Sequence, residues 1–485
     1  IMPSFRTLGL ACVLLVSVES QFLVGVQHKT MRTMKPLDHR RSASSEASLK
    51  GDGGDYAVPI TVGKSTLTVT LDTGSSTFAV ARCGHDLPVK ACYSGGTNLD
   101  SPVSDNYASG NWTGDWYEDT VSFGGVGGLS NDVLAAVDVH VAGITDQYDF
   151  FFNNAAGNPG GVDGILGLAY AALSNYPNVE TTISSLIRQN DLENTFSLYL
   201  CPATAGQTGS IGYMIVGAGA DYTSLYDTSE GISWTPIQHP TYYTITIESL
   251  HVGSTHLSEL DDVFAANYPN SPGNSDIIDS GYSSLGLQTE VFEALTNELV
   301  AQGFGPASLF STGYSATLSP PDLSQWPKLT FTLSGGTQVS VSPEHYVQPL
   351  NTLCSTSYSL AISDAGKDEG NALGNPLFND YFVIFERDNN RIGFAPMAGQ
   401  SDNCDAPATP SGTEGCDFNV DHRGGSPSVP YDADAAHSPS GWIWIPIAAG
   451  TVFVAAAVAA TVVLRRRRAQ RQVELLDMYA RHENA

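Results

Sequence analysis

Two short segments of the chain share a residue pattern that could carry out catalysis: an apolar run, an aspartate, a hydroxyl residue and a glycine. The first spans residues 70–76 (TLDTGSS) around Asp72, and the second spans residues 277–283 (IIDSGYS) around Asp279. In such a turn the glycine lets another backbone approach closely, and the hydroxyl group can hydrogen-bond to neighbouring backbone. Each aspartate is therefore expected at the edge of a core, held by its own loop.

The chemistry of two such loops depends on whether their carboxyl groups meet. Two carboxyl groups within a few ångströms of each other cannot both ionise, so one proton is shared and the pair titrates as a unit. The ionised partner can then take a proton from a trapped water while the protonated partner polarises a carbonyl group. This is amide hydrolysis without a covalent intermediate, and it requires no cofactor and no metal.

The spacing of the two segments indicates an internal repeat. Each aspartate is followed at the same distance of 95 residues by the glycine of an apolar-apolar-glycine element, Gly167 after Asp72 and Gly374 after Asp279. One Asp-Thr-Gly would be weak evidence, because aspartate and glycine are ordinary turn formers. Two copies with matched trailing elements predict two related lobes, each of which contributes one aspartate.

The elements that must position these loops are short strands. The chain has 485 residues, 48 of them Gly and 26 Pro, and residues 51–396 alternate β-branched runs with turn residues. Residues 181–189 and 290–302 are among the few helix candidates. The predicted fold is therefore all-β and bilobal, with an N-terminal lobe at residues 51–235 and a C-terminal lobe at residues 236–400.

The N-terminal part of the chain precedes the first lobe and has a different composition. Residues 8–18 are apolar and follow Arg6, a pattern typical of a secretory signal peptide, which we expect at residues 1–20. Residues 21–50 are polar and basic. They are interpreted either as a pro-segment that neutralises an acidic cleft or as a disordered arm.

The C-terminal part predicts an anchor in a membrane. Residues 442–464 carry no charge and are followed by four arginines, so they are expected to form a transmembrane helix with residues 465–485 as a cytosolic tail. Residues 401–441 are rich in Pro, Gly and Ser and are expected to form a stalk. This is a single-pass type I arrangement, with the lobes lumenal or extracellular in the secretory or endosomal pathway or at the cell surface.

The charge of the chain excludes one class of partner. The formal net charge is −28, and residues 51–464 hold 9 basic against 44 acidic residues. Such a surface repels phosphate backbones, so nucleic-acid binding is not expected. His251 and His256 lie five residues apart on one strand-like stretch and would point to opposite faces, and the cysteines lack zinc-ligand spacing, so a metal site is not expected either.

Over residues 52–400 the chain resembles the pepsin-like aspartic proteases, and specifically their membrane-anchored beta-secretase-like branch. The resemblance is carried by residues 72–80 (DTGSSTFAV), 107–114 (YASGNWTG), 163–170 (DGILGLAY) and 375–396. It implies the bilobal pepsin-like fold, peptide or protein substrates bound as an extended strand between the lobes, and a monomer.

The resemblance also implies roles for individual residues. Asp72 and Asp279 would be the catalytic dyad, and Gly74 and Gly281 would receive the substrate backbone. Tyr107 would be the tyrosine of the flap, the hairpin that closes over the substrate. The supporting residues are Thr73 and Ser280, which would hydrogen-bond between the lobes, and Ser75, which would hydrogen-bond to the outer oxygen of Asp72.

Two positions depart from the family pattern. Tyr282 stands where the family has a Thr or Ser that hydrogen-bonds to the second aspartate, and Gly286 stands where the beta-secretase-like branch has an arginine. The altered surroundings of Asp279 leave open the alternative of a catalytically inactive receptor or binding module with the same fold, although both aspartate motifs are intact. A glycosidase with paired carboxylates would not explain the repeat.

Six cysteines remain after loss of the signal peptide, an even number that suits an oxidising compartment. In pepsin-like enzymes a small loop is closed by a disulfide at the position of Cys83 and Cys92. The beta-secretase-like branch implies a second pair, Cys201 with Cys404. The third pair is then Cys354 with Cys416.

Overall fold

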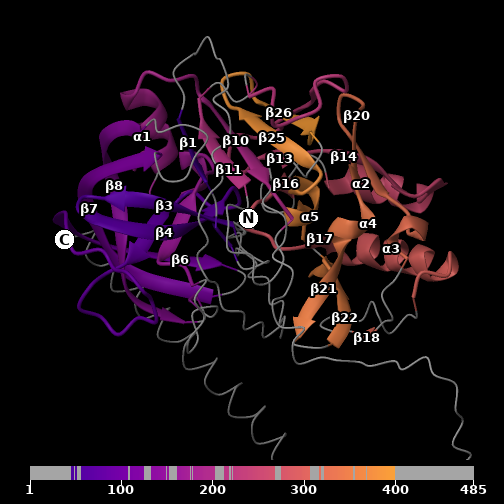
Figure 1. Ribbon diagram of the computed structural model, residues 1–485, viewed down its shortest axis with the longest axis horizontal. Helices are drawn as coiled ribbons and strands as arrows, with labels where there is room; N and C mark the ends of the chain where they lie inside the picture. The colour runs from indigo at the N-terminus through magenta and orange to yellow at the C-terminus, as the bar shows by residue number, and fades with distance from the viewer. Residues whose placement is uncertain are drawn as a thin grey trace, which may run out of the picture. The chain divides into compact units, whose positions relative to one another are not determined.

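The computed structural model describes most of residues 45–398 in one structural unit. Within that range it leaves out residues 49, 52–55, 108–109, 125–132, 149, 152–160, 175, 177–178, 203–211, 218–219, 221, 268–274, 306–315, 318–321, 353–354 and 368. Strands predominate, as the alternation of β-branched runs and turns predicts. Strands of the first half of the described chain gather on one side and those of the second half on the other (Figure 1). Between them lie β10 (Thr195–Leu200), β11 (Gly212–Val216) and β25 (Tyr381–Glu386).

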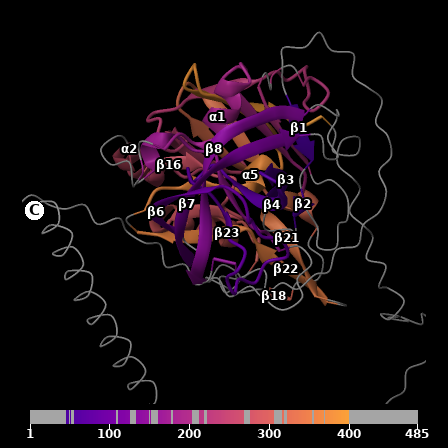
Figure 2. The same cartoon turned by 90° about the vertical axis from the view of Figure 1, so that its left-hand side faces the viewer.

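The first lobe is built on one eight-stranded sheet, in the order β2-β3-β4-β9-β5-β8-β7-β6. Its strands are β2 (Lys50–Gly51), β3 (Tyr56–Val62), β4 (Ser65–Asp72), β5 (Phe78–Ala81), β6 (Thr97–Tyr107), β7 (Gly110–Gly124), β8 (Val133–Tyr148) and β9 (Gly164–Gly167). The neighbours β6, β7 and β8 are the longest described strands and lie together in the turned view (Figure 2). The β6–β7 hairpin carries the residues that resemble the flap.

A six-stranded sheet joins the two halves of the chain, in the order β1-β11-β10-β25-β26-β12. Its strands are β1 (Ser45–Ser48), β10 (Thr195–Leu200), β11 (Gly212–Val216), β12 (Ser233–Pro236), β25 (Tyr381–Glu386) and β26 (Arg391–Pro396). β10 pairs antiparallel with β25, with Phe196 opposite Phe385. These two rings stack at 4.7 Å between centroids, and both contact the buried ring of Tyr243. The core therefore continues from one half of the chain into the other.

Three smaller sheets make up the second lobe. They contain β13 (Thr244–Ile245), β16 (Asp276–Ile278), β24 (Ala372–Leu373), β17 (Leu285–Gln288) and β23 (Ile362–Gly366); β15 (Thr255–His256), β14 (Ile247–Val252), β19 (Leu329–Leu333) and β20 (Thr337–Val341); and β18 (Ala316–Thr317), β22 (Ser355–Leu360) and β21 (Val347–Thr352). The helices are α1 (Thr182–Gln189), α2 (Asp261–Asn267), α3 (Thr289–Ala301), α4 (Pro343–Tyr346) and α5 (Asn375–Phe378). α1 and α3 confirm the two helices expected from the sequence.

The internal repeat appears as two matching strand pairs. β4 runs parallel to β9, which brings Asp72 opposite Gly167, and β16 runs parallel to β24, with Ile278 opposite Leu373. In each lobe the apolar-apolar-glycine element thus lies beside the strand that leads into an aspartate. The equal spacing along the chain reflects this shared geometry.

The expectation for His251 and His256 was wrong. A turn at Gly253, whose φ is +61°, separates β14 from β15, so the two histidines face each other across a hairpin. Their rings stack at 4.6 Å between centroids. Alternation of side chains holds only along one strand, and the turn reverses the chain between these residues. The described residues nevertheless contain no group of three or more side chains able to hold a metal ion.

Several predicted segments lie outside the described residues: the signal peptide (1–20), the stalk (401–441), the transmembrane segment (442–464) and the tail (465–485). Among the helices of the described part, none is long and apolar enough to span a membrane. Residues 45–48 and Lys50, which belong to the segment interpreted as a pro-segment, form strands paired with β11 and β3. The site at which that segment would be cut stays a prediction.

Candidate active site

The structure brings both aspartates together, as the sequence predicts. Asp72 ends β4 and Asp279 follows β16, and their side chains are only 6% and 9% exposed. A Cβ atom placed on Gly74 would lie 2.7 Å from Cγ of Asp279, and one on Gly281 would lie 2.8 Å from Cγ of Asp72. Only glycine leaves room for the carboxyl group of the opposite lobe. The two turns therefore pack against each other with the carboxyl groups between them.

Each carboxyl group is also fixed by its own turn. The backbone N–H of Gly74 donates to Oδ1 of Asp72 at 2.8 Å, and the N–H of Gly281 donates to Oδ1 of Asp279 at the same distance. The two loops are thus related in geometry as well as in sequence. In both, Oδ1 of the aspartate accepts the backbone N–H of the glycine that follows two residues later in the chain.

Thr73 and Ser280 connect the lobes behind the dyad. Thr73 Oγ1 donates to the carbonyl of Ile278 at 2.9 Å, and Ser280 Oγ donates to the carbonyl of Leu71, also at 2.9 Å. Each hydroxyl oxygen also accepts the backbone N–H of the other residue, at 2.8 Å from Ser280 and 3.2 Å from Thr73. These four bonds lie in the buried interior and set the separation of the two turns.

The surroundings of the two aspartates differ in their effect on protonation. Burial raises the pKa of Asp279 well above its usual range, and the charge of Asp72 raises it further. Burial also raises the pKa of Asp72, but the nearby hydroxyl group of Ser75 and the backbone N–H of Gly74 counteract part of that rise. The two buried carboxyl groups therefore titrate as a pair that favours retention of one shared proton.

Ser75 lies beside the dyad, at the position that the resemblance implies. Its hydroxyl group is buried and close enough to Asp72 to lower the pKa of that carboxyl group. Among the described residues, however, its oxygen has no hydrogen bond of good geometry. In this structure Ser75 therefore lies close to Asp72 but does not form the expected hydrogen bond with its outer oxygen.

Tyr107 is the last residue of β6, and its side chain lies near Asp72. Its ring packs against Phe150 at 5.3 Å between centroids, and its hydroxyl lies 3.4 Å from Oδ2 of Asp105. Burial raises the pKa of the Tyr107 phenol well above its usual range, and the charges of Asp105 and Asp72 add to that rise. The residue expected to be the flap tyrosine therefore lies within electrostatic reach of the dyad. The turn at 108–109 is outside the described residues.

Tyr282 does not take over the contact that the family residue makes with the second aspartate. A Cβ atom on Gly286 would lie 2.6 Å from Cζ and 2.8 Å from the hydroxyl oxygen of Tyr282, so the phenol ring covers that glycine. Burial raises the pKa of the Tyr282 phenol, and a hydrogen bond with Ser363 counteracts part of that rise. The two departures from the family pattern are thus in contact: the ring of Tyr282 fills the space that a side chain at position 286 would need.

Sequence reasoning missed two residues next to the dyad. Thr77 Oγ1 donates to Oδ2 of Asp105 at 3.1 Å, which links the Asp72 loop, residues 73–77, to β6. A signal was available, because Asp105 stands two residues before Tyr107 on a strand and residues so spaced share one face. Their contact could not be predicted from a local pattern, because 28 residues separate Thr77 from Asp105 in the sequence.

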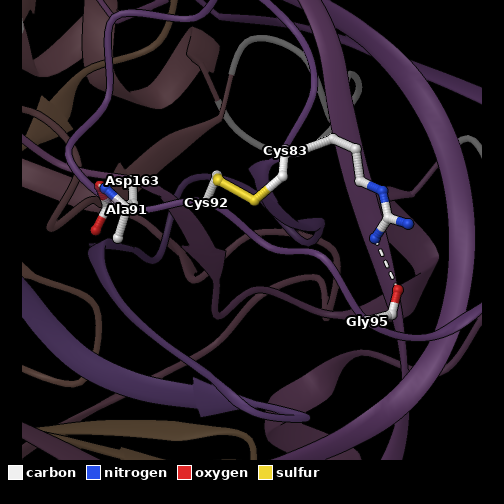
Figure 3. The surroundings of a disulfide bond; sticks show 6 residues. Cys83, Ala91, Cys92, Gly95 and Asp163 are labelled. Atoms are coloured by element: carbon white, nitrogen blue, oxygen red, sulfur yellow. Dashed lines mark hydrogen bonds between the residues drawn. A yellow bond between two sulfur atoms is a disulfide. The ribbon is translucent and has the colours of Figure 1, made fainter.

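The small disulfide loop is confirmed. Cys83 is bonded to Cys92, and the neighbouring residue Ala91 donates its backbone N–H to Oδ1 of Asp163 at 2.9 Å (Figure 3). The other oxygen of Asp163 accepts the N–H of Thr68 at 3.0 Å, so this carboxylate ties the loop to β4. The loop is therefore anchored to the strand that leads to Asp72.

Cys201 is disulfide-bonded as well. The cysteines expected to complete the other two pairs, Cys404 for Cys201 and Cys354 with Cys416, lie outside the described residues. These two pairings stay predictions.

Comparison with known proteins identifies the family to which the chain belongs. The family model of the eukaryotic aspartyl proteases matches residues 55–397. A beta-secretase of Strongylocentrotus purpuratus is 27% identical over 432 residues, which cover 80% of this chain and 75% of that protein. Pepsin A of Bos taurus is 28% identical over 61% of this chain and 69% of its own, and gastricsin of Mus musculus is 30% identical over 48% and 54%. The chain therefore belongs to the eukaryotic aspartyl protease family and is a pepsin-like aspartic endopeptidase with a beta-secretase among its relatives.

Proposed function

We propose that this endopeptidase hydrolyses peptide bonds with a water molecule activated between Asp72 and Asp279, while one C-terminal helix tethers it to a membrane. The observation that carries the first part is the pair of buried carboxyl groups packed against the glycines of the opposite turns. The difference in their surroundings supports one role for each. Asp72 acts as general base on the water, and protonated Asp279 polarises the carbonyl oxygen of the scissile amide.

The supporting residues follow from the same contacts. Thr73 and Ser280 keep the two turns in register, and Ser75 lowers the pKa of Asp72. Gly74, Gly281 and Tyr107 contact the substrate, a peptide or protein segment that lies extended between the lobes under the β6–β7 hairpin. Pre-aligned groups of this kind lower the barrier, because orientation is established before the reaction begins.

The domain plan and the tether rest on the sequence. The signal peptide is residues 1–20, the pro-segment 21–50, the lobes 51–235 and 236–400, and the stalk 401–441. The uncharged segment 442–464, followed by four arginines, supports a type I helix with a cytosolic tail at 465–485. The catalytic lobes are then lumenal or extracellular, and the protein is made as a zymogen.

A cleavage assay with the full chain tests the mechanism. Cleavage of a peptide library should be greatest at acidic pH and fall as the pair loses its remaining proton. Asp72→Asn and Asp279→Asn should each reduce the rate by about 10²–10⁴-fold or more, because general acid–base catalysis is lost. Full activity in either variant would mean that cleavage arises elsewhere.

A topology assay tests the tether. In sealed vesicles, an epitope placed after Ala485 should be open to added protease, while the lobes stay protected. An epitope protected together with the lobes would contradict the type I arrangement.

A further inference from the structure

Asp105 connects two parts of the active site that are separate in sequence. Its Oδ2 atom accepts the Thr77 hydroxyl of the Asp72 loop at 3.1 Å, and the hydroxyl of Tyr107 lies 3.4 Å from the same oxygen. Its Oδ1 atom accepts the backbone N–H of Asn106 at 3.0 Å. One half-buried carboxylate thus bridges the loop that carries the dyad and the strand that carries the tyrosine.

The charge of Asp105 has no counter-ion in the described part of the chain. The ion pairs found there involve Glu180, Asp261, Asp380 and Glu386 as the acidic partners. The titratable groups that face Asp105 are Asp72, Tyr107 and, from the segment before β13, Tyr242. Its other polar neighbours, Thr77 and Asn106, are neutral.

We propose that Asp105 is a positioning residue for peptide cleavage: it holds Tyr107 against the Asp72 loop, and its negative charge helps the dyad to keep its shared proton. This inference rests on the proposed function of Asp72 and Asp279. The physical basis of the second effect is that a like charge nearby disfavours ionisation of a carboxyl group. With Asp105 ionised, the proton-sharing form of the dyad persists to higher pH, so the enzyme stays active over a wider range.

Asp105 itself titrates above its ordinary range. Burial raises the pKa of its carboxyl group, and the charge of Asp72 contributes. Its help to the dyad is therefore greatest toward the upper end of the active pH range, where Asp105 is ionised. At lower pH the protonated carboxyl group no longer repels the ionised form of the dyad.

The test uses the full chain and measures kcat and KM for one peptide from acidic to neutral pH. Asp105→Asn removes the charge but keeps an acceptor oxygen, whereas Asp105→Val removes both. Thr77→Val removes the donor hydroxyl and keeps the shape of the side chain. Asp138→Asn is the matched control, because Asp138 is an exposed carboxylate on β8, a strand of the same sheet.

In Asp105→Asn the falling limb of the pH profile should move to lower pH by about one unit. Asp105→Val and Thr77→Val should each lower kcat/KM about tenfold at the optimum, because Tyr107 is no longer held. The double variant Thr77→Val/Asp105→Val should lose little more than either single variant, because both remove the same link. Asp138→Asn should leave the profile unchanged.

Two results of the kinetic measurements would overturn the inference. The first is a pH profile of Asp105→Asn that coincides with that of Asp138→Asn. The second is a loss of kcat/KM in the double variant that equals the product of the losses in Thr77→Val and Asp105→Val. A second readout is the affinity for a peptide whose scissile amide is replaced by a hydroxyl-bearing group, which Asp105→Val should weaken about tenfold. Absence of cleavage by the parent protein after removal of its pro-segment would instead refute the proposed function, and unchanged peptide affinity in Asp105→Val would refute the inference separately.

Discussion

The hydroxyl group of Thr73 accepts the backbone N–H of Ser280 from the other lobe at 2.8 Å and donates to the carbonyl of Ile278 at 2.9 Å. One side chain therefore satisfies two buried backbone groups on the strand and turn that carry Asp279. These bonds join the turns that carry Asp72 and Asp279 through neutral groups, so they do not require either aspartate to be ionised.

Thr73→Val should lower both stability and activity. The substitution keeps the shape of the side chain but leaves two buried backbone groups unpaired, which costs about 1–3 kcal/mol of the free energy of unfolding. Chemical denaturation at acidic pH would measure the loss. The control is Thr61→Val, because the hydroxyl of Thr61 meets only Thr66 in an exposed pair on β3–β4. Equal unfolding midpoints for the two variants would contradict the role of Thr73.

Asp279→Asn should stabilise the protein at neutral pH relative to the parent. Because the pKa of Asp279 is raised in the folded state, folding takes up a proton when the pH is above the ordinary carboxyl pKa. The free energy of unfolding of the parent therefore decreases as the pH rises from that value toward the raised pKa. The amide carries no charge and removes this dependence.

Denaturation curves at several pH values would measure the effect in Asp279→Asn. The stability gain over the parent should be largest near neutrality and shrink on acidification. A difference between the two proteins that stays constant with pH would rule out Asp279 as the group that takes up the proton. Asp138→Asn again serves as a control with an exposed carboxylate.

Gly286→Ala should destabilise the parent but not a Tyr282→Thr variant. In the parent the new methyl group would lie 2.6 Å from Cζ of the Tyr282 ring, and such overpacking costs about 1–3 kcal/mol. Threonine is too short to reach that space, so the penalty should disappear in the double variant. Equal penalties in both backgrounds would show that the ring does not occupy this position.

Tyr282→Thr should also shift the falling limb of the pH profile while activity remains, since threonine restores a family-typical hydrogen-bond partner for Asp279.

The disulfides can be mapped without activity measurements. A peptide map of the non-reduced protein should join Cys83 to Cys92 and Cys201 to Cys404. Replacing Cys83 and Cys92 together by serine should cost about 2–3 kcal/mol of stability, the order expected for a short closed loop. A peptide that links Cys83 to Cys201 would contradict the scheme.

The loops that carry Asp72 and Asp279 could be predicted from the sequence because they repeat one local pattern. Asp72 and Asp279 follow apolar strands, and a single spacing relates each to its partner strand. The helices at Thr182–Gln189 and Thr289–Ala301 were predictable for a similar reason, since their signal lies within a few turns of chain. Local periodicity was sufficient for these elements.

What the sequence could not provide depends on side-chain direction and on distant contacts. The strand pattern did not reveal that Gly253 reverses the chain between His251 and His256. Nor did residue types reveal that the ring of Tyr282 lies over Gly286. Whether a side chain points toward a carboxylate or toward a neighbouring glycine depends on packing that only the folded chain defines.

The six-stranded sheet has a consequence for the order in which the enzyme is made. Its inner strands β25 and β26 are the last described strands of the chain, yet they pair with β10 and β12. During synthesis the first lobe emerges with Asp72 long before these strands exist, and domains generally fold in that order. The sheet that joins the halves is complete only after Pro396 has been translated. A nascent chain therefore has no joined pair of lobes, and its proteolytic capacity arises only late in synthesis.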